Sequence, residues 1–118
     1  MLENQINCKT GDIYMADLDV NGEGSLQTGR RPVLIISNDM ANKYSPVITV
    51  IPMTSRMGKK KLPTHVYIKD CGLRKPSIAL AEQITSISKS KLLNKMGSIK
   101  TTIYESLVKD AIAVQLCM

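Results

Sequence analysis

The stretch that decides the fold of this chain places two arginines at the entrance of an apolar strand, and it reads Gly29-Arg30-Arg31-Pro32-Val33-Leu34-Ile35-Ile36-Ser37-Asn38-Asp39. Pro32 fixes the backbone where the strand begins and where its missing N–H does least harm. Because residues 33–36 are apolar at every position, we expect a central strand covered on both faces. The two guanidinium groups suit phosphate, although an ordinary solvated junction between loop and strand is the alternative reading.

Strand-like segments of similar length surround this one. They are rich in Val, Ile and Tyr, are separated by Gly, Pro, Asn and Asp, and cover residues 12–17, 32–37, 47–52, 64–69 and 77–84. No long helical pattern stands between successive strands, so the spacing favours an antiparallel sheet over a parallel one. The predicted fold is mainly β, a small antiparallel barrel with appended helices.

We expect helices after the second strand and in the last third of the chain. Residues 40–45 can form a helical turn, and residues 88–95 read as a short helix from a Ser cap to a stop near Gly97. The strongest helix covers residues 102–116, where Thr102 and Glu105 fit a capping box. Its core face is predicted to hold Ile103, Leu107, Ala111 and Val114, widened by Tyr104, Val108 and Ile112.

Length and composition predict one domain over residues 1–118. At 118 residues, 43% hydrophobic and 22% charged, the chain has the composition of a globular protein and room for one core. It shows neither an apolar run long enough to cross a bilayer nor a basic leader followed by an apolar block. We therefore expect a cytoplasmic protein without a membrane partner.

The cysteine and histidine content argues against a metal or another cofactor. Cys8, Cys71 and Cys117 are odd in number and show no CxxC spacing, which predicts free thiols rather than disulfides or a zinc site. With His65 as the single histidine, there is no ligand cluster for metal-dependent hydrolysis. A catalytic cysteine assisted by His65 has no nucleophile signature in the sequence. No metal and no cofactor are expected.

The charge balance indicates a polyanionic partner. Sixteen Lys and Arg against ten Asp and Glu give a formal net charge of +6. The cations gather in two clusters, one at Arg30 and Arg31 and the other at Arg56, Lys59, Lys60 and Lys61. These clusters favour nucleic acid. Because the chain has no Phe and no Trp, contacts to phosphates and base edges must replace a broad stacking platform.

RNA carries a nucleophile that needs no metal, because its 2′-OH can attack the adjacent phosphate. A protein then has to align the groups, move protons and stabilise the phosphorane, and guanidinium groups and a hydroxyl can do much of this. Arg31 and Thr54 carry these groups at the entrance of one predicted strand and the exit of another. Such ends can meet on neighbouring antiparallel strands. The alternative role of Thr54 is a turn hydroxyl bonded to its own backbone.

Five blocks of the sequence, taken in order, resemble those of the MazF/PemK family of toxin endoribonucleases. They are Gly11-Asp12-Ile13-Tyr14, residues 24–39, Pro52-Met53-Thr54-Ser55, Lys61-Leu62-Pro63-Thr64-His65-Val66 and Ala79-Leu80-Ala81-Glu82-Gln83-Ile84. The resemblance implies an SH3-like antiparallel barrel with a C-terminal helix, a homodimer, and metal-independent, sequence-specific cleavage of single-stranded mRNA. The implied products are a 2′,3′-cyclic phosphate and a 5′-OH.

The same resemblance assigns roles to residues. Arg31 matches the family's catalytic arginine, expected to stabilise the phosphorane, and Thr54 its catalytic threonine, expected to orient the scissile phosphate. The positions expected to contact or steer RNA are Ser25, Gln27, Arg30, Arg56, Lys59, Lys60, Lys61, Leu62, Pro63, Thr64, His65 and Gln83. For His65 a base contact comes first, and a satisfied strand histidine and a catalytic acid are the alternatives. Leu26 departs from the pattern, since many members carry Glu there.

The resemblance also implies a partner, a MazE-like antitoxin that is acidic, partly disordered and folds on binding. DNA is expected only as a partner of the complex between toxin and antitoxin. Two other classes of function stay open at this point. One is a non-catalytic, CcdB-like toxin that binds gyrase on the same fold, and the other is a nucleic-acid-binding SH3-like module without turnover. Arg31 and Thr54, in their family context, favour the nuclease.

Overall fold

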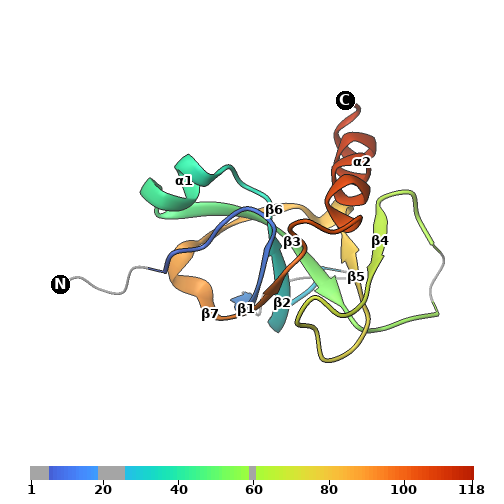
Figure 1. The fold of residues 1–118 in the computed structure, drawn as a ribbon, viewed down its shortest axis with the longest axis horizontal. Helices are drawn as coiled ribbons and strands as arrows, with labels where there is room; N and C mark the ends of the chain where they lie inside the picture. The colour runs from blue at the N-terminus through green and yellow to red at the C-terminus, as the bar shows by residue number, and fades with distance from the viewer. Residues whose placement is uncertain (1–5, 19–25, 59–60) are drawn as a thin grey trace.

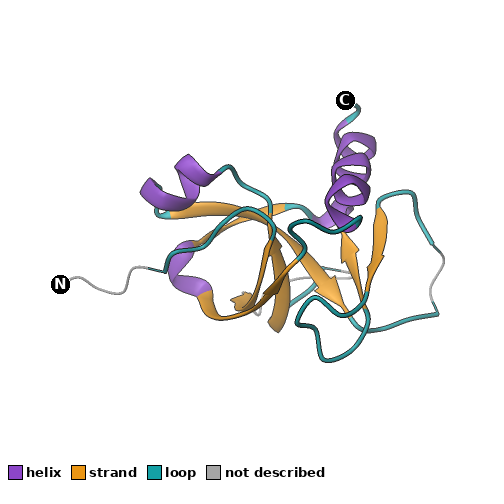
Figure 2. Cartoon of the chain, viewed as in Figure 1, coloured by secondary structure: helices purple, strands orange, loops and turns teal. Residues whose placement is uncertain are grey.

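A computed structural model describes residues 6–18, 26–58 and 61–118 and shows a curved β-sheet with a helix toward either end (Figure 1). Strands and loops make up most of the chain (Figure 2). The strands are β1 (Asp12–Leu18), β2 (Gly29–Ile35), β3 (Val47–Thr54), β4 (His65–Ile68), β5 (Ser77–Leu80), β6 (Thr85–Ser88) and β7 (Leu92–Ser98). The helices are α1 (Asp39–Tyr44) and α2 (Tyr104–Leu116), with 3₁₀ turns η1 (Ala81–Gln83) and η2 (Lys89–Lys91).

All the strand pairs are antiparallel. The strand order is β4-β5-β3-β2-β1-β7, and β6 pairs with β3 beside this path. β3 is the organising strand, because it pairs with β2, β5 and β6 along different parts of its length. Within the described residues no pairing joins β4 to β7, so the sheet is not closed. The prediction of a mainly β, antiparallel fold with a C-terminal helix is confirmed.

β2 is covered on both faces, as its apolar run predicts. Val33 and Ile35 belong to one buried cluster and Leu34 to another, and none of the three is exposed to solvent. Burial of a side chain of this size stabilises a fold by about 1.5–3 kcal/mol. The strand begins at Gly29, earlier than predicted, because its first residues pair with β1. Pro32 therefore lies within the strand.

The predicted helix over residues 88–95 is wrong. Ser88 ends β6, residues 89–91 form η2, and Leu92 begins β7, which pairs with β1. The long unbranched side chains of this segment suit a helix, but the backbone ladder to β1 and the burial of Leu92 outweigh that propensity. The strand predicted over residues 77–84 ends at Leu80 for a related reason, since residues 81–83 form η1.

Helix α2 forms close to its predicted position and packs through one part of the predicted core face. The face that packs against the sheet consists of Tyr104, Val108, Ala111 and Ile112. The predicted core positions Ile103, Leu107 and Val114 are 69%, 40% and 52% exposed. Both faces of the helix carry apolar residues, so periodicity alone could not identify the buried one. The prediction is confirmed at Ala111 and at the widening positions Tyr104, Val108 and Ile112, and it is wrong at Ile103, Leu107 and Val114.

Both predicted capping residues of α2 accept hydrogen bonds from the backbone, but each bond comes from a residue one position before the donor that a capping box predicts. Thr102 Oγ1 accepts a hydrogen bond from the N–H of Tyr104 at 3.1 Å, and Glu105 Oε1 accepts one from the N–H of Thr101 at 3.2 Å. The helix begins at Tyr104, which shifts the donors that need a partner. Over residues 6–18, 26–58 and 61–118, no helix has the length and apolar character that crossing a membrane requires.

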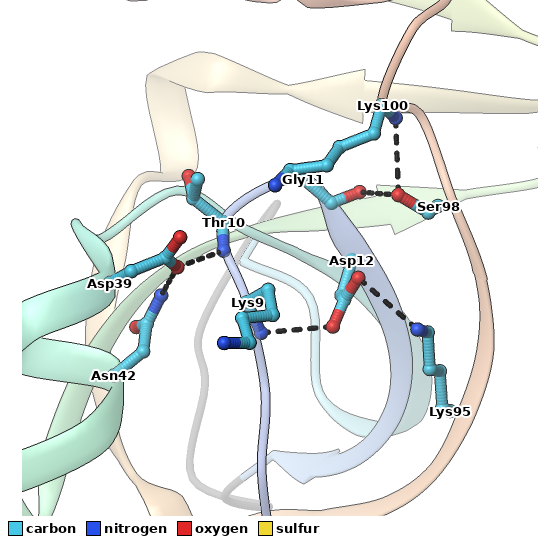
Figure 3. Close-up of polar contacts among 9 residues, drawn as sticks. All are labelled: Lys9, Thr10, Gly11, Asp12, Asp39, Asn42, Lys95, Ser98 and Lys100. Carbon is cyan, nitrogen blue, oxygen red and sulfur yellow. Dashed lines mark hydrogen bonds and ion pairs between the residues drawn. The ribbon is translucent and has the colours of Figure 1, made fainter.

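Polar contacts to α1 and β7 fix the start of β1 (Figure 3). Asp12 is buried, accepts a hydrogen bond from the N–H of Lys9 at 2.9 Å and lies 3.5 Å from Lys95 Nζ. The N–H of Thr10 donates to Asp39 at 2.7 Å. That bond, together with one from Asn42, lowers the pKa of the Asp39 carboxyl. These contacts hold β1 in place, and the register of β2 follows from its pairing with β1.

Candidate active site

Arg31 and Thr54 lie two residues beyond the last pair of the ladder that joins β2 and β3. The ladder between these strands pairs Val33 with Pro52, and continuing that register by two residues places Arg31 opposite Thr54. Side chains at opposing positions of antiparallel strands extend from the same face of the sheet. The topology therefore brings a guanidinium and a hydroxyl to one face, although 23 positions separate them along the chain.

Arg31 is half-buried, and one of its donors holds the side chain against its own loop. Arg31 Nε donates to the carbonyl oxygen of Thr28 at 2.8 Å. A guanidinium has five N–H donors in a planar fork. The terminal nitrogens have no hydrogen bond to the described residues that would compete with two oxygens of a phosphate. The side chain is thus oriented by one bond and can bind an anion with the rest.

Arg30 lies on the other face of the sheet. Successive residues of a strand point to opposite faces. Arg30 is exposed and is the register partner of Asp17, whereas Arg31 is the partner of the buried Ala16. Of the two arginines, only Arg31 shares a face with Thr54, so the pair that looked equivalent in the sequence is unequal in the fold.

The hydroxyl of Thr54 has a local partner. Thr54 Oγ1 accepts a hydrogen bond from the N–H of Arg56 at 3.1 Å, which holds the turn that follows β3. This is the turn role that the sequence left as an alternative. It uses one lone pair of the oxygen, and the hydroxyl proton can still be donated. The local bond therefore orients Thr54 without removing its capacity to donate to a phosphate oxygen.

A carboxylate that the sequence did not single out fixes the segment over residues 61–65. Glu82 accepts a hydrogen bond from the hydroxyl of Thr64 at 2.7 Å and contacts His65 Nε2 at 2.9 Å. The N–H of Leu62 points at His65 Nδ1 at 3.4 Å. Because Nδ1 faces a donor, the arrangement assigns the ring proton to Nε2, which donates to Glu82. The geometry is that of a satisfied strand histidine, the second of the three roles considered for His65.

The charge state of Glu82 follows from these contacts. Burial alone would raise the pKa of its carboxyl, but the hydrogen bonds from Thr64 and His65 outweigh burial and lower the pKa. Glu82 is therefore an anion at neutral pH. Since Thr64 is buried and His65 points inward to this anion, the side chains that remain exposed for a ligand in this segment are those of Lys61, Leu62 and Pro63.

Gln27 and Gln83 are joined by a backbone-to-side-chain bond. The N–H of Gln27 donates to Gln83 Oε1 at 2.9 Å, which ties the residues before β2 to η1. The side-chain oxygen of Gln27 is buried and has no hydrogen-bond partner within the described parts of the chain. An acceptor in that state suits a ligand that brings an N–H or O–H group. Arg56 is exposed in the turn after β3, and Ser25, Lys59 and Lys60 lie outside the described residues.

Neither a metal nor a reactive thiol is indicated by the described residues. Over residues 6–18, 26–58 and 61–118, no group of three or more His, Cys, Asp and Glu is placed to hold a metal ion. Burial raises the pKa of the Cys8 and Cys71 thiols, which is the opposite of the shift that activates a cysteine nucleophile. His65 has Glu82 as its partner.

Sequence reasoning missed Glu82 as an anchoring group and a third basic cluster at Arg74 and Lys75. Glu82 stood beside Gln83 within a quoted block, but only the fold shows that it faces His65. Arg74 and Lys75 line a pocket together with Arg30. The signal in the sequence was two consecutive cations before Pro76, at the entrance of β5, which repeats the arrangement of Arg30, Arg31 and Pro32 at β2.

The fold is that of a small antiparallel β protein, with a half-buried arginine, Arg31, near the end of β2 that leads toward Thr54. Over residues 9–116 the sequence matches a family described as the PemK-like, MazF-like toxin of type II toxin–antitoxin systems. The match covers nearly the whole chain, so this chain belongs to that family. The predicted family is confirmed.

Solved structures share the fold. The MazF protein of Deinococcus radiodurans is 21% identical, with a TM-score of 0.78 over 97% of this chain and 100% of that chain. A mycobacterial endoribonuclease in complex with its cognate antitoxin is 21% identical, with a TM-score of 0.76 over 94% and 96% of the two chains. The Mycobacterium tuberculosis toxin MazF-mt6 is 24% identical, with a TM-score of 0.75 over 91% and 97%. At these identities the likeness establishes the fold.

Proposed function

We propose that this chain is a toxin endoribonuclease that cleaves single-stranded mRNA at short sequence motifs, without a metal. The observation that carries the proposal is the register of β2 and β3, which, if it continued by two residues, would place Arg31 opposite Thr54, in a member of the MazF-like toxin family. Two similar structures are described as endoribonucleases. The 2′-OH of the RNA attacks the adjacent phosphorus, the bond from phosphorus to the 5′-oxygen breaks, and the ends left are a 2′,3′-cyclic phosphate and a 5′-OH.

In this mechanism Arg31 supplies the charge that the reaction needs. The phosphorane carries two negative charges, and a guanidinium already oriented by Thr28 can stabilise them without reorganisation during the step. Thr54 donates its hydroxyl to a phosphate oxygen and fixes the attack geometry. An arginine is a poor general base, because its pKa lies far above neutrality. Arg31 therefore acts by stabilising charge, and the proton acceptor is another group.

The residues proposed to contact RNA are those that the family resemblance assigns. Arg30, Arg56, Lys59, Lys60 and Lys61 steer the backbone, while Ser25, Gln27, Leu62, Pro63 and Gln83 shape base recognition. Thr64 and His65 contribute indirectly, because they are bonded to Glu82. The chain acts as one domain and as a cytoplasmic homodimer, and an acidic MazE-like antitoxin neutralises it. One structure of the same fold contains a cognate antitoxin. Binding to DNA is limited to the complex with the antitoxin.

A digest of a long RNA in EDTA tests the proposal. Wild-type protein should produce discrete fragments whose 5′ ends are hydroxyls and whose 3′ ends are cyclic phosphates. Arg31→Ala should abolish them, and Lys109→Ala, an exposed change on α2, should leave them unchanged. Mapping the 5′ ends also identifies the cleavage motif.

Two outcomes would overturn the proposal. Undiminished cleavage by Arg31→Ala would assign the activity to another site or to a contaminant. A gel shift without fragments, from folded wild-type protein, would identify an RNA-binding module without turnover. If neither cleavage nor binding occurs, inhibition of gyrase supercoiling would support the CcdB-like alternative.

A further inference from the structure

A second cationic site is lined by both arginines of β2, Arg30 and Arg31. It is an open pocket of about 270 Å³ formed between β2, the end of β3 and the segment that leads into β5. Its lining includes four cations, Arg30, Arg31, Arg74 and Lys75, together with the exposed Ser55 and the buried Ser77. Its floor is apolar and consists of Met15, Pro32, Met53, Leu73 and Met96. None of the described residues that line it is a carboxylate.

The segment that carries Arg74 and Lys75 is held against β7 by two glycines. A Cβ atom added to Gly72 would collide with the carbonyl of Met96, and one added to Gly97 would collide with the carbonyl of Cys71. The two backbones can lie this close only because neither position has a side chain. Gly72 also has φ +92°, and the N–H of Leu73 donates to the carbonyl of Asp70 at 2.9 Å, which closes the turn.

The other end of the segment is anchored where β5 begins. Ser77 is buried, and its hydroxyl donates to the carbonyl oxygen of Lys75 at 3.1 Å. Ser77 also pairs with Ile68 of β4. The backbone at Arg74 and Lys75 is therefore fixed on both sides, while both side chains are exposed. Because this backbone is already ordered, binding a ligand to the two charged side chains costs little backbone conformational entropy.

We propose that this pocket binds a backbone phosphate of the RNA next to the one that is cleaved. The inference rests on the proposed function, because Arg31, the proposed catalytic arginine, also lines the pocket. A strand of RNA whose scissile phosphate lies against Arg31 has its neighbouring phosphates within reach of the same end of β2. Arg and Lys on a phosphate give affinity without base readout. The methionine floor, without an aromatic ring, suits the sugar edge of any nucleotide.

An acidic peptide would complement the same charges, but one observation favours RNA. The candidate catalytic arginine, Arg31, is part of the pocket lining. An RNA strand bound for cleavage would contact Arg31 and the pocket together, whereas a peptide partner has no need of the catalytic arginine. Asp17 is the register partner of Arg30 and offsets part of its charge. Arg74 and Lys75 are therefore the residues that report on the pocket most directly.

The test compares the double variant Arg74→Ala/Lys75→Ala with the wild type and with Lys109→Ala, an exposed cation on α2 outside the pocket. The probe is a long single-stranded 2′-O-methyl RNA, which binds but has no 2′-OH to attack, titrated between about 50 and 200 mM salt. We expect about tenfold weaker binding for the double variant and a salt slope shallower by about 0.7, which corresponds to one phosphate contact on a single strand. Arg74→Lys/Lys75→Arg should restore both values.

The outcomes separate this proposal from the function on which it rests. Cleavage of long RNA by the double variant should occur at unchanged positions and with an unchanged kcat at saturation, since phosphate contacts carry no base readout. Wild-type affinity and wild-type salt slope in the double variant would overturn the phosphate subsite while leaving the nuclease intact. If the double variant keeps its RNA affinity but loses binding of a polyglutamate peptide, the pocket belongs to an acidic protein partner and the proposal is wrong.

Discussion

Glu82 and His65 are joined by a 2.9 Å contact between a carboxylate oxygen and the Nε2 atom of the imidazole. The contact crosses from η1 to the first residue of β4, and the second oxygen of the same carboxylate accepts the hydroxyl of Thr64. One side chain thus holds two successive residues of the segment expected to recognise RNA. Any motion of that segment has to break a charged, partly buried set of bonds, so its shape is set before the RNA arrives.

The first prediction concerns the pH dependence of stability. The pKa of Glu82 is lowered in the folded state, so its contribution is fully present above the unfolded value of about 4.3 and is lost as the pH falls through the folded value. Glu82→Gln should cost about 1–3 kcal/mol at pH 7, because a neutral amide cannot accept both donors as a carboxylate does. Urea unfolding of both proteins between pH 7 and pH 3 measures the difference, which should shrink in acid.

Glu105→Gln is the matched control, since Glu105 is exposed at the start of α2 and makes a single bond. It should cost less at pH 7, because only one exposed hydrogen bond is changed. A constant difference between Glu82→Gln and wild type from pH 7 to pH 3 would contradict the assignment. Nitrogen NMR of the single histidine provides a second readout, with the Nε2–H form expected in the wild type and a mixture in the variant.

The second prediction separates the two arginines. Arg31→Ala should lower kcat for RNA cleavage by about 100- to 1,000-fold, since it removes the charge that stabilises the phosphorane. Arg30→Ala should raise KM several-fold and leave kcat nearly unchanged, because Arg30 lies on the other face and contacts only the backbone of the bound strand. Steady-state kinetics with a short fluorescent RNA measures both constants. Equal losses of kcat in the two variants would exclude the division of roles.

The third prediction concerns the hydroxyl of Thr54. Thr54→Val keeps the shape but removes the donor to phosphate, and we expect a loss of about 10- to 100-fold in kcat. It also removes the acceptor for the N–H of Arg56, at a cost of about 1 kcal/mol in stability. Thr54→Ser keeps the hydroxyl and should recover both properties. If Thr54→Ser is as inactive as Thr54→Val, the methyl group rather than the hydroxyl is what matters.

The fourth prediction concerns the contact between the turn after β4 and β7. Gly72→Ala should destabilise the fold by about 3 kcal/mol or more, because the new methyl group meets the backbone of Met96. Gly58 has nearly the same backbone angle, φ +88°, with no atom near its missing side chain. Gly58→Ala should therefore cost only about 1 kcal/mol, the strain of the angle itself. Thermal unfolding of the two variants isolates the collision from the strain, and equal losses would refute the close approach.

The fifth prediction tests which face of α2 is buried. Val108→Ala should cost about 1–3 kcal/mol, because Val108 is 4% exposed and packs in the core. Val114→Ala makes the same chemical change on a residue that is 52% exposed and should change stability by less than about 0.5 kcal/mol. Chemical denaturation measures both values. The reverse order would show that Val114 rather than Val108 lies in the core.

A strand could be predicted from the sequence where its burial produces a local pattern of apolar residues. β2 is apolar at consecutive positions because both of its faces are covered, and that pattern reads directly from residues 33–36. β7 has no such apolar pattern. Its residues have helical propensity, and it forms a strand because its backbone pairs with β1. The packing face of α2 was ambiguous for a similar reason, because apolar residues occupy two faces and only tertiary contacts choose between them.

Some residues of the candidate site could be predicted from the sequence, and others could not. Arg31 and Thr54 could be named from their positions at strand ends and from the family blocks, and the register between β2 and β3 is compatible with their pairing. The position of Glu82 could not be predicted, because it depends on how η1 sits beside β4. Nor could the pocket at Arg74 and Lys75, which forms because two glycines let a turn approach β7.

The alternation of Arg30 and Arg31 along β2 makes correct strand alignment a condition for activity. If β2 slipped by one residue against β1 and β3, every side chain on it would change face, and Arg30 would stand where Arg31 belongs. Net charge, composition and most strand content would survive such an error, yet the wrong arginine would meet Thr54. Turnover would then report a folding fault that circular dichroism could not detect.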